Sequence, residues 1–209
     1  DLINNKTYVI ASDGDLMEGI SHESMSLAGH LKLKNLIVFF DNNKISIDGS
    51  TSLSVSDNYK KRFESYGWSF QDINGHNFKQ IFNAIKKATK SKKPSIISCK
   101  TIIGFGSPNK SGKASSHGAP LGEKEIKLMR KKLKWKHEPF IIPEELMNSW
   151  REIGRKGEEL EGEWKNTLNK KNIKIKEEYE RLTKGEFPSD LNKIFGDEKL
   201  KFFQTKPKM

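Results

Sequence analysis

The residues best suited to chemistry are a carboxylate and an amide that each follow an apolar run. Asp13 and Gly14 come directly after residues 8–11, and Asn43 follows residues 36–40. Carboxylate and amide oxygens, offered without His or Cys, suit a hard cation such as Mg²⁺, which completes its octahedron with phosphate oxygens and water. Gly14 has no Cβ, so a phosphate group could approach the backbone at this point. The pattern predicts a site for a metal ion and a diphosphate.

Two strands and a helix are expected to position these residues. The two apolar runs predict strands, and between them four apolar residues recur at the spacing of one helix face: Ile20, Leu27, Ala28 and Leu31. Strand, helix and strand over about 30 residues form a right-handed βαβ unit with parallel strands. Asp13 and Asn43 would then share the carboxyl edge of one sheet, where open α/β sheets bind ligands. The amino end of the helix would present free N–H groups there.

An alternative is that these residues are ordinary turn residues, because Asp, Gly and Asn are common in strand-to-helix loops. Spacing alone leaves both interpretations open. The surrounding sequence favours the ligand site, because several collinear stretches resemble transketolases. These stretches are residues 13–23 (DGDLMEGISHE), 26–29 (SLAG), 45–49 (ISIDG) and 63–68 (FESYGW). In that family an Asp-Gly pair and a later Asn bind Mg²⁺, and the Mg²⁺ holds the diphosphate of thiamine diphosphate.

The resemblance implies a metal site and a cofactor site. Asp13, Asn43 and the backbone carbonyl of Ile45 would bind Mg²⁺, for which Ca²⁺ or Mn²⁺ can substitute. Asn43 would also contact the cofactor. The sequence departs from the family at Ser12, which stands where the usual Gly-Asp-Gly motif has its first Gly. Ser is small and is not a metal ligand, so this change concerns the backbone conformation of the motif and not the metal.

The resemblance assigns three further residues. Gly14 would lie against the diphosphate, and Ile47 would pack on the cofactor ring. Glu18 stands where the family has a Glu that reaches toward the other subunit, so we expect it at the interface of a homodimer. In the family, a preceding segment and a following pyrimidine-binding domain supply the remaining cofactor and sugar contacts.

A long loop rich in Gly, Ser and Pro follows the last predicted strand. Its residues 100–107 (KTIIGFGS) and 116–118 (SHG) resemble the transketolase loop whose His contacts both cofactor and sugar. The resemblance therefore makes His117 the candidate catalytic and substrate-binding residue. Residues 113–115 (KAS) replace the Thr-His-Asp of many relatives, so a second nearby His is absent. The remaining histidines are expected in helices or turns without a role: His22, His30, His76 and His137.

The order of the predicted elements indicates an α/β fold with a parallel, doubly wound sheet. Beyond the first βαβ unit, we expect a helix over 59–66 with Asp57 as its N-cap, a strand over 68–73, a helix from residue 78 and a strand over 96–101. The helix from residue 78 would bury one stripe: Phe78, Ile81, Phe82 and Ile85. A helix over 123–133, an extended link over 135–143 and charged helices over 144–183 would follow. Residues 1–135 would form the latter part of a diphosphate-binding domain, and residues 136–209 a helical linker toward a pyrimidine-binding domain.

Composition bounds the possible functions. The chain has 209 residues, 34% of them hydrophobic, and a formal net charge of +11. The charge comes mostly from lysines spread over several predicted helices, without an aromatic-basic motif, which favours a solvated surface over nucleic-acid binding. The longest apolar run, residues 36–40, is too short to cross a bilayer, and the single Cys99 is expected as a buried apolar residue. A cytoplasmic protein is expected. Because the chain begins at Asp1 rather than Met, we also expect an excerpt of a longer chain.

The expected activity is that of a transketolase of the pentose phosphate pathway, acting within a full-length homodimer. Such an enzyme uses thiamine diphosphate to transfer a two-carbon ketol unit from a ketose phosphate to an aldose phosphate, and the isolated excerpt would be inactive. Two alternatives stay open. One is another thiamine-diphosphate enzyme, such as deoxyxylulose-phosphate synthase or dihydroxyacetone synthase, and the other is a non-catalytic half-domain that binds a partner.

Overall fold

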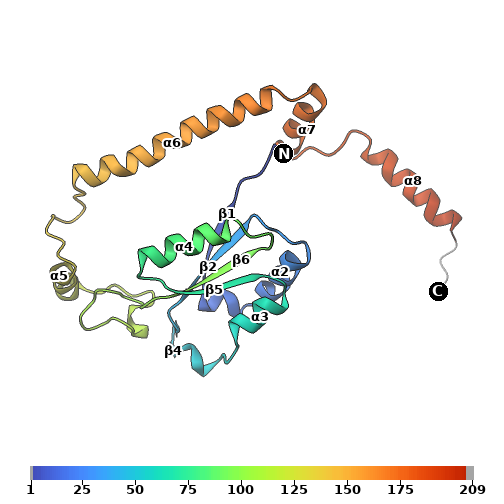
Figure 1. The fold of residues 1–209 in the computed structure, drawn as a ribbon. Helices are drawn as coiled ribbons and strands as arrows, with labels where there is room; N and C mark the ends of the chain where they lie inside the picture. The colour runs from blue at the N-terminus through green and yellow to red at the C-terminus, as the bar shows by residue number, and fades with distance from the viewer. Residues whose placement is uncertain (1, 206–209) are drawn as a thin grey trace. The chain divides into compact units, whose positions relative to one another are not determined.

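The structure is a computed structural model that describes residues 2–205, and it contains two compact units. The first unit, residues 3–141, is built on a four-stranded sheet in the order β1-β2-β6-β5 (Figure 1). Its strands are β1 (Thr7–Ser12), β2 (Leu36–Asn42), β5 (Ser69–Asn74) and β6 (Ser95–Lys100). All three strand pairs are parallel, which confirms the predicted fold class.

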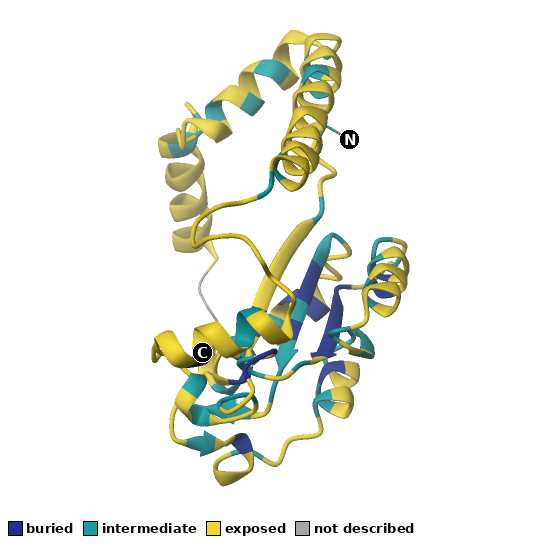
Figure 2. Cartoon of the chain, turned by 90° about the vertical axis from the view of Figure 1, so that its left-hand side faces the viewer, coloured by how far each residue is buried: buried dark blue, intermediate teal, exposed yellow. Residues whose placement is uncertain are grey.

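Helices cover both faces of this sheet. Alternate residues of each strand point to opposite sides, so each face carries apolar side chains that a helix can bury. Val38 and Phe40 of β2 pack with α1 (Asp13–Met17), α2 (Gly19–His30) and α3 (Tyr59–Ser65). Ile37 and Phe39 of β2 pack on the other face, with α4 (Phe78–Ala88). The sheet is therefore doubly wound. The buried positions of the sheet lie mainly in β2 and β6, whereas β1 is largely exposed (Figure 2).

The register of the strands brings their carboxyl ends to one edge. Ser12 pairs with Asp41, and Asn42 and Asn74 both pair with Lys100. The residues that follow each strand consequently emerge side by side at the same edge. The shared edge predicted for Asp13 and Asn43 is confirmed, and a small hairpin of β3 (Ile45–Ser46) and β4 (Gly49–Ser50) stands beside it.

The helix predicted between strands β1 and β2 is confirmed, but the face that it was expected to bury was wrong. The segment forms the short α1 and then α2, separated at Glu18. Ile20, Leu27 and Leu31 are between 56% and 74% exposed, whereas Ala28 and Gly29 are buried. The reason is close packing: a Cβ placed on Gly29 would lie 1.8 Å from the backbone oxygen of Tyr66. Helix α2 thus packs through Gly29 against the link between α3 and β5, at Tyr66 and Trp68.

Helix α4 also buries small residues instead of its predicted apolar stripe. Phe78 is 88% exposed, whereas the buried residues are Ala84 and Ala88. The predicted apolar stripe is therefore mostly outside the core of the described chain. A smaller correction concerns α3, whose N-cap is Asn58 and not Asp57: the Asn58 side chain accepts a hydrogen bond from Lys61 N at 3.0 Å.

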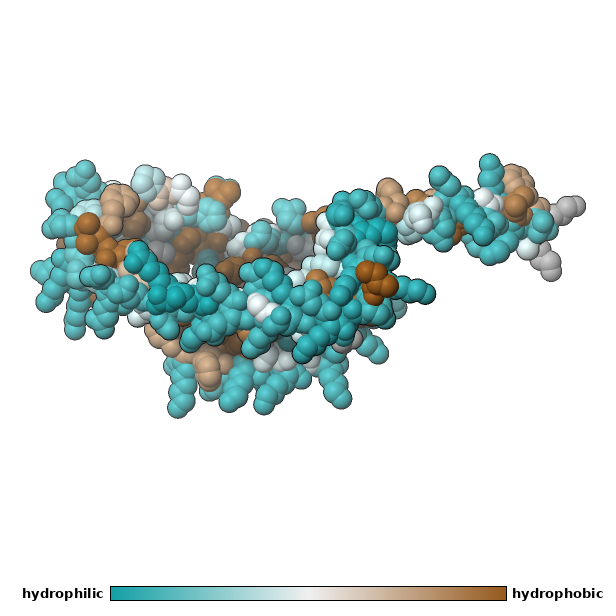
Figure 3. Space-filling model, turned by 90° about the horizontal axis from the view of Figure 1, so that it is seen from above, coloured by the Kyte–Doolittle hydropathy of each residue, from teal (hydrophilic) through white to brown (hydrophobic). Residues whose placement is uncertain are grey.

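The second unit consists of residues 142–205 together with Leu2. It contains three largely exposed helices, α6 (Glu144–Asn169), α7 (Ile173–Thr183) and α8 (Leu191–Gln204). Trp164 gives α6 a tertiary contact, because its ring lies 5.4 Å from that of Tyr179 and its Nε1 donates to Leu2 O at 3.1 Å. Exposed apolar side chains on α8 appear as brown and tan spots on a teal surface (Figure 3). Within residues 2–205, no helix is long and apolar enough to cross a membrane.

The division near residue 141 is close to the predicted boundary at 135, although α5 (Glu123–Lys132) and the link after it belong to the first unit. The identity of the two predicted domains stays a prediction. Asp1 and residues 206–209, which the prediction assigned to the first domain and to the linker, lie outside the described residues.

Candidate functional site

A pocket of about 410 Å³ opens at the carboxyl edge of the sheet. Three segments line it: the turn from β1 into α1, the β3–β4 hairpin and the long loop after β6. Among its lining residues are five of the predicted site residues: Gly14, Asn43, Ile45, Ile47 and His117. The structure thus brings together residues that lie up to 103 positions apart in the sequence. Asp13 lies beside this pocket and lines a smaller one of about 240 Å³ together with Lys44.

Asp13 is a buried carboxylate at the first position of α1, only 2% exposed. Its Oδ2 accepts a hydrogen bond from Lys44 N at 3.0 Å, which holds the side chain against the backbone that follows Asn43. Burial raises the pKa of Asp13 above its ordinary value, the charge of Asp41 raises it further, and the backbone N–H groups of Lys44 and Asn43 oppose both effects. A divalent cation would relieve the cost of this buried negative charge.

Asn43 is held in one orientation by two hydrogen bonds. Its Nδ2 donates to Asp41 Oδ2 at 3.1 Å, and its Oδ1 accepts from Ile45 N at 2.9 Å. An amide oxygen has two lone pairs, so Oδ1 keeps one for a cation. Asp41, which the sequence analysis did not single out, also accepts a hydrogen bond from Thr101 Oγ1. The signal for Asp41 was its place as a charged residue directly after the apolar run of β2.

Ser12 and Asp15 shape the turn at the start of α1. The backbone N and Oγ of Ser12 both donate to Asp15 Oδ2, at 2.7 and 2.8 Å, and these bonds lower the pKa of Asp15. The hydroxyl of Ser12 therefore adds a hydrogen bond that stabilises the turn. A Cβ placed on Gly14 would meet no atom closer than 4.0 Å, so packing within the described chain does not require glycine there. The bare backbone at Gly14 leaves room for a ligand.

The hairpin supplies an apolar wall. Ile47 lies between β3 and β4 and is 73% exposed, although it lines the pocket. The hairpin is tied by Ser46 Oγ, which donates to Gly49 O at 3.1 Å, and by Thr51 N, which donates to Lys44 O at 3.0 Å. An exposed branched side chain on a braced hairpin can pack against a flat ring.

His117 is exposed and lies at the end of η2 (Ala114–Ser116) in the long loop. Internal hydrogen bonds give this loop a defined path: Gly112 N donates to Ile103 O at 2.8 Å, and Ser116 Oγ donates to Lys110 O at 2.6 Å. His117 N itself donates to Ala114 O at 2.8 Å. The imidazole is therefore presented at the pocket by an ordered backbone.

The side chain of Glu125, in the first turn of α5, anchors the middle of this loop. It is buried and accepts hydrogen bonds from Ser107 Oγ, from Asn109 N at 2.8 Å and from Asn109 Nδ2 at 2.9 Å. These bonds lower the pKa of Glu125 to about 2, with Ser107 making the largest contribution. No sequence signal marks Glu125 as an anchor, because acidic residues commonly stand in the first turn of a helix.

The remaining predicted residues lie away from the pocket wall. Glu18 is exposed at the junction of α1 and α2, and its role at a dimer interface stays a prediction. His22 and His30 lie in α2, and His137 lies in the link after α5, as expected. His76 lies in the turn between β5 and α4, where its contacts exceed those of a simple turn residue.

The donor set fits a magnesium diphosphate. A buried carboxylate, a fixed amide oxygen and the backbone of Ile45 lie at one edge, next to a pocket with room at Gly14. Among residues 2–205 no group of three or more His, Cys, Asp and Glu side chains could hold a metal by itself. A cation bound here would thus depend on ligand oxygens to complete its coordination, as Mg²⁺ does with phosphates.

Comparisons with known proteins agree with this geometry. The family model described as "Transketolase, thiamine diphosphate binding domain" matches residues 1–188. The transketolase of Buchnera aphidicola subsp. Acyrthosiphon pisum is 56% identical over 166 residues, which cover 78% of this chain and 25% of that protein. Transketolase 2 of Escherichia coli is 47% identical over 198 residues, which cover 92% of this chain and 30% of that protein.

Solved structures show the same similarity. The crystal structure of transketolase from Campylobacter jejuni superimposes with a TM-score of 0.83 at 39% identity, covering 90% of this chain and 30% of that chain. The transketolase of Leishmania mexicana superimposes with a TM-score of 0.85 at 33% identity, covering 90% and 29%. The chain spans less than a third of the length of these relatives.

Proposed function

We propose, from the premise that this chain belongs to the transketolase family through its thiamine-diphosphate-binding domain, that it holds magnesium thiamine diphosphate for the transfer of a two-carbon ketol unit. The donor would be a ketose phosphate and the acceptor an aldose phosphate. The observation that carries the proposal is the pocket that gathers Gly14, Asn43, Ile45, Ile47 and His117 beside the buried Asp13.

The environment of each residue supports the role that the resemblance implies for it. Asp13, the Oδ1 of Asn43 and the backbone carbonyl of Ile45 would bind Mg²⁺, with Ca²⁺ or Mn²⁺ as substitutes. Gly14 would let the diphosphate approach the backbone at the start of α1, and Ile47 would pack against the cofactor ring. The hydrogen bonds from Asn43 to Asp41 and Ile45 keep the amide in place before the ion arrives.

When bound, thiamine diphosphate supplies a nucleophilic carbon that accepts the two-carbon unit and passes it on. The part of this chain in that chemistry is orientation: His117, held by its ordered loop, would donate to substrate hydroxyl groups at the mouth of the pocket. We place the complete enzyme in the pentose phosphate pathway of the cytoplasm, as a homodimer with Glu18 at the subunit interface.

The cofactor proposal is tested by calorimetry on the 209-residue chain, with thiamine diphosphate titrated in the presence of Mg²⁺. Saturable binding is expected, and Asp13→Ala should abolish it. Asp48→Ala is the matched control, because Asp48 lines the same pocket, is exposed and has no proposed role. Equal binding by the Asp13→Ala variant, or no binding by the unaltered chain, would overturn the proposal.

The transferase proposal needs the rest of the enzyme. A chimera of Escherichia coli transketolase 2, with its matching segment replaced by this chain, should transfer ketol units between sugar phosphates. His117→Ala in the chimera should lower kcat/KM by about 100-fold, the usual contribution of one positioned polar group. A chimera that binds cofactor but transfers nothing would favour the non-catalytic partner-binding module. The relatives reported above are transketolases, which favours this activity over that of deoxyxylulose-phosphate synthase.

A further inference from the structure

The turn between β5 and α4 is pressed against the point where β6 leads into the long loop. Gly75 N donates to Lys100 O at 2.8 Å, and a Cβ placed on Gly75 would lie 2.5 Å from Thr101 Cγ2. The next residue, His76, is fixed by its backbone N, which donates to Asn74 Oδ1 at 2.9 Å. The backbone that carries the His76 side chain is therefore fixed at the end of the sheet.

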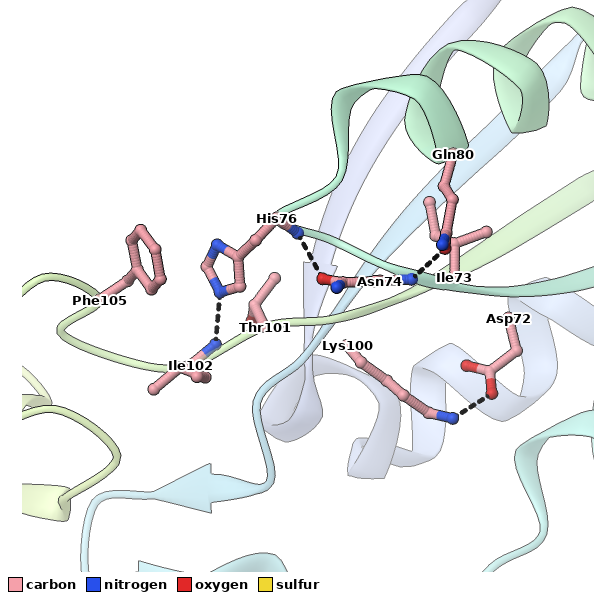
Figure 4. A pocket seen from close by; sticks show the side chains of 9 residues that line it. All are labelled: Asp72, Ile73, Asn74, His76, Gln80, Lys100, Thr101, Ile102 and Phe105. Carbon is pink, nitrogen blue, oxygen red and sulfur yellow. Dashed lines mark hydrogen bonds and ion pairs between the residues drawn. The ribbon is translucent and has the colours of Figure 1, made fainter.

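The His76 ring makes two contacts with the start of that loop (Figure 4). Its Nε2 accepts a hydrogen bond from Ile102 N at 3.0 Å. Its face stacks on Phe105, with ring centroids 4.0 Å apart and an interplanar angle of 20°. Because Nε2 is the acceptor, the neutral ring carries its proton on Nδ1. His76 thus clamps both ends of the first turn of the loop, residues 102–105.

That first turn contacts the residue just before His117. Phe105 N donates to Ile102 O at 3.1 Å, and Ile103 O accepts from Gly112 N at 2.8 Å, which closes the loop on itself. Gly104 has a φ of +64°, and a Cβ there would lie 2.7 Å from Ser116 Oγ. The residue before His117 therefore packs on the turn that His76 holds.

We infer that His76 is a positioning residue for the His117 loop, and that it acts only as a neutral imidazole. This inference rests on the proposed role of His117 in the function above. Protonation of Nε2 would turn the acceptor into a donor facing the donor Ile102 N–H, so only the neutral ring can hold the loop in this way. His76 lines a pocket at this edge of the sheet, and the charged groups that line it too are Asp72 of β5 and Lys100 of β6, which pair with each other at 2.5 Å. Gln80 of α4 and the loop residues that line this pocket are neutral.

The test is NMR on the ¹⁵N-labelled 209-residue chain, with amide hydrogen exchange and histidine ring signals followed at one fixed pH. In the unaltered chain, the Ile102 amide should exchange slowly, because it donates to His76 Nε2. His76→Phe keeps a ring for Phe105 but removes the acceptor. It should speed exchange of the Ile102 and Gly112 amides by at least about tenfold and move the His117 ring signals.

A second variant and a control separate positioning from general stability. His76→Gln retains an acceptor and should recover slow exchange at Ile102. His30→Gln changes an exposed histidine in α2 and should alter none of these signals. Unchanged Ile102 exchange and His117 signals in His76→Phe, or Ile102 exchange in His76→Gln as fast as in His76→Phe, would overturn the inference. Calorimetry with magnesium thiamine diphosphate on the same samples tests the proposed function separately, because the NMR signals require no cofactor.

Discussion

The packing of α2 on α3 predicts that one added methyl group will destabilise the first unit. Replacing Gly29 by Ala places a Cβ 1.8 Å from the backbone oxygen of Tyr66 and 3.2 Å from Trp68 Cδ1. The first neighbour is backbone and cannot rotate away, so α2 and the end of α3 must separate. The same contact includes the hydrogen bond from Trp68 Nε1 to Met25 O, at 2.8 Å, which separation would stretch.

The expected loss in free energy of unfolding is about 3 kcal/mol. Overpacking costs about 1–3 kcal/mol, and a fixed backbone neighbour puts this site at the upper end. Weakening the Trp68 bond adds about 1 kcal/mol. Alanine is the better helix former by about 1 kcal/mol, which offsets part of the loss.

Urea denaturation followed by tryptophan fluorescence measures this change, because Trp68 is buried in the first unit. Gly19→Ala is the matched control in the same helix, since a Cβ there meets no atom within 4 Å. Its midpoint should stay within the equivalent of about 0.5 kcal/mol of the unaltered chain. Equal midpoints for Gly29→Ala and Gly19→Ala would refute the described packing of α2.

Three further predictions concern single residues. Asp13→Asn should raise the thermal midpoint of the ligand-free chain at pH 7. The pKa of Asp13 is raised in the folded chain, so its ionised form opposes folding, and stability is lost as pH rises from the unfolded toward the folded pKa. A lower midpoint would contradict this. Burial and the charges of Asp41 and Asp72 raise the pKa of Cys99 from 9.0 to about 11. The thiol should therefore react with a thiol reagent about 100-fold more slowly in the folded chain than in the urea-unfolded chain. Equal rates would contradict the burial of Cys99. Phe40→Ala should lower the free energy of unfolding, measured by urea denaturation, by about 3–5 kcal/mol, because Phe40 is buried. Phe78→Ala should lower it by less than about 1 kcal/mol, because Phe78 is exposed. Similar losses would contradict the exposure of Phe78.

Topology and the carboxyl edge could be predicted from sequence, because both depend on local patterns. Apolar runs at 8–11 and 36–40 became neighbouring parallel strands, and the residues after them emerged at one edge. The helix faces could not be predicted in this way. Periodicity finds the apolar face of α2 or α4, but burial depends on which neighbour approaches, and the small residues Gly29 and Ala84 are the ones buried.

The residues that hold the site residues in place could not be predicted from local sequence patterns either. Asp41 bonds to Thr101, which is 60 positions away, and His76 bonds to Ile102, which is 26 positions away. Glu125 receives its hydrogen bonds from residues 16 and 18 positions earlier. No spacing rule connects such partners, since the folded loop brings them together. The candidate ligands were found because they belong to motifs, whereas the residues that orient them are recognised only from contacts.

The most direct test of the account asks whether one cation joins the Asp13–Asn43 edge to the cofactor diphosphate. Mn²⁺ bound to the chain with thiamine diphosphate should show ³¹P hyperfine coupling by electron–nuclear double resonance, as phosphate oxygens in the inner coordination sphere require. Asp13→Asn and Asn43→Ala should abolish this protein-bound signal, and Asp48→Asn should keep it. A coupling that survives both ligand substitutions, or bound Mn²⁺ without phosphorus coupling, would contradict the proposed cation bridge.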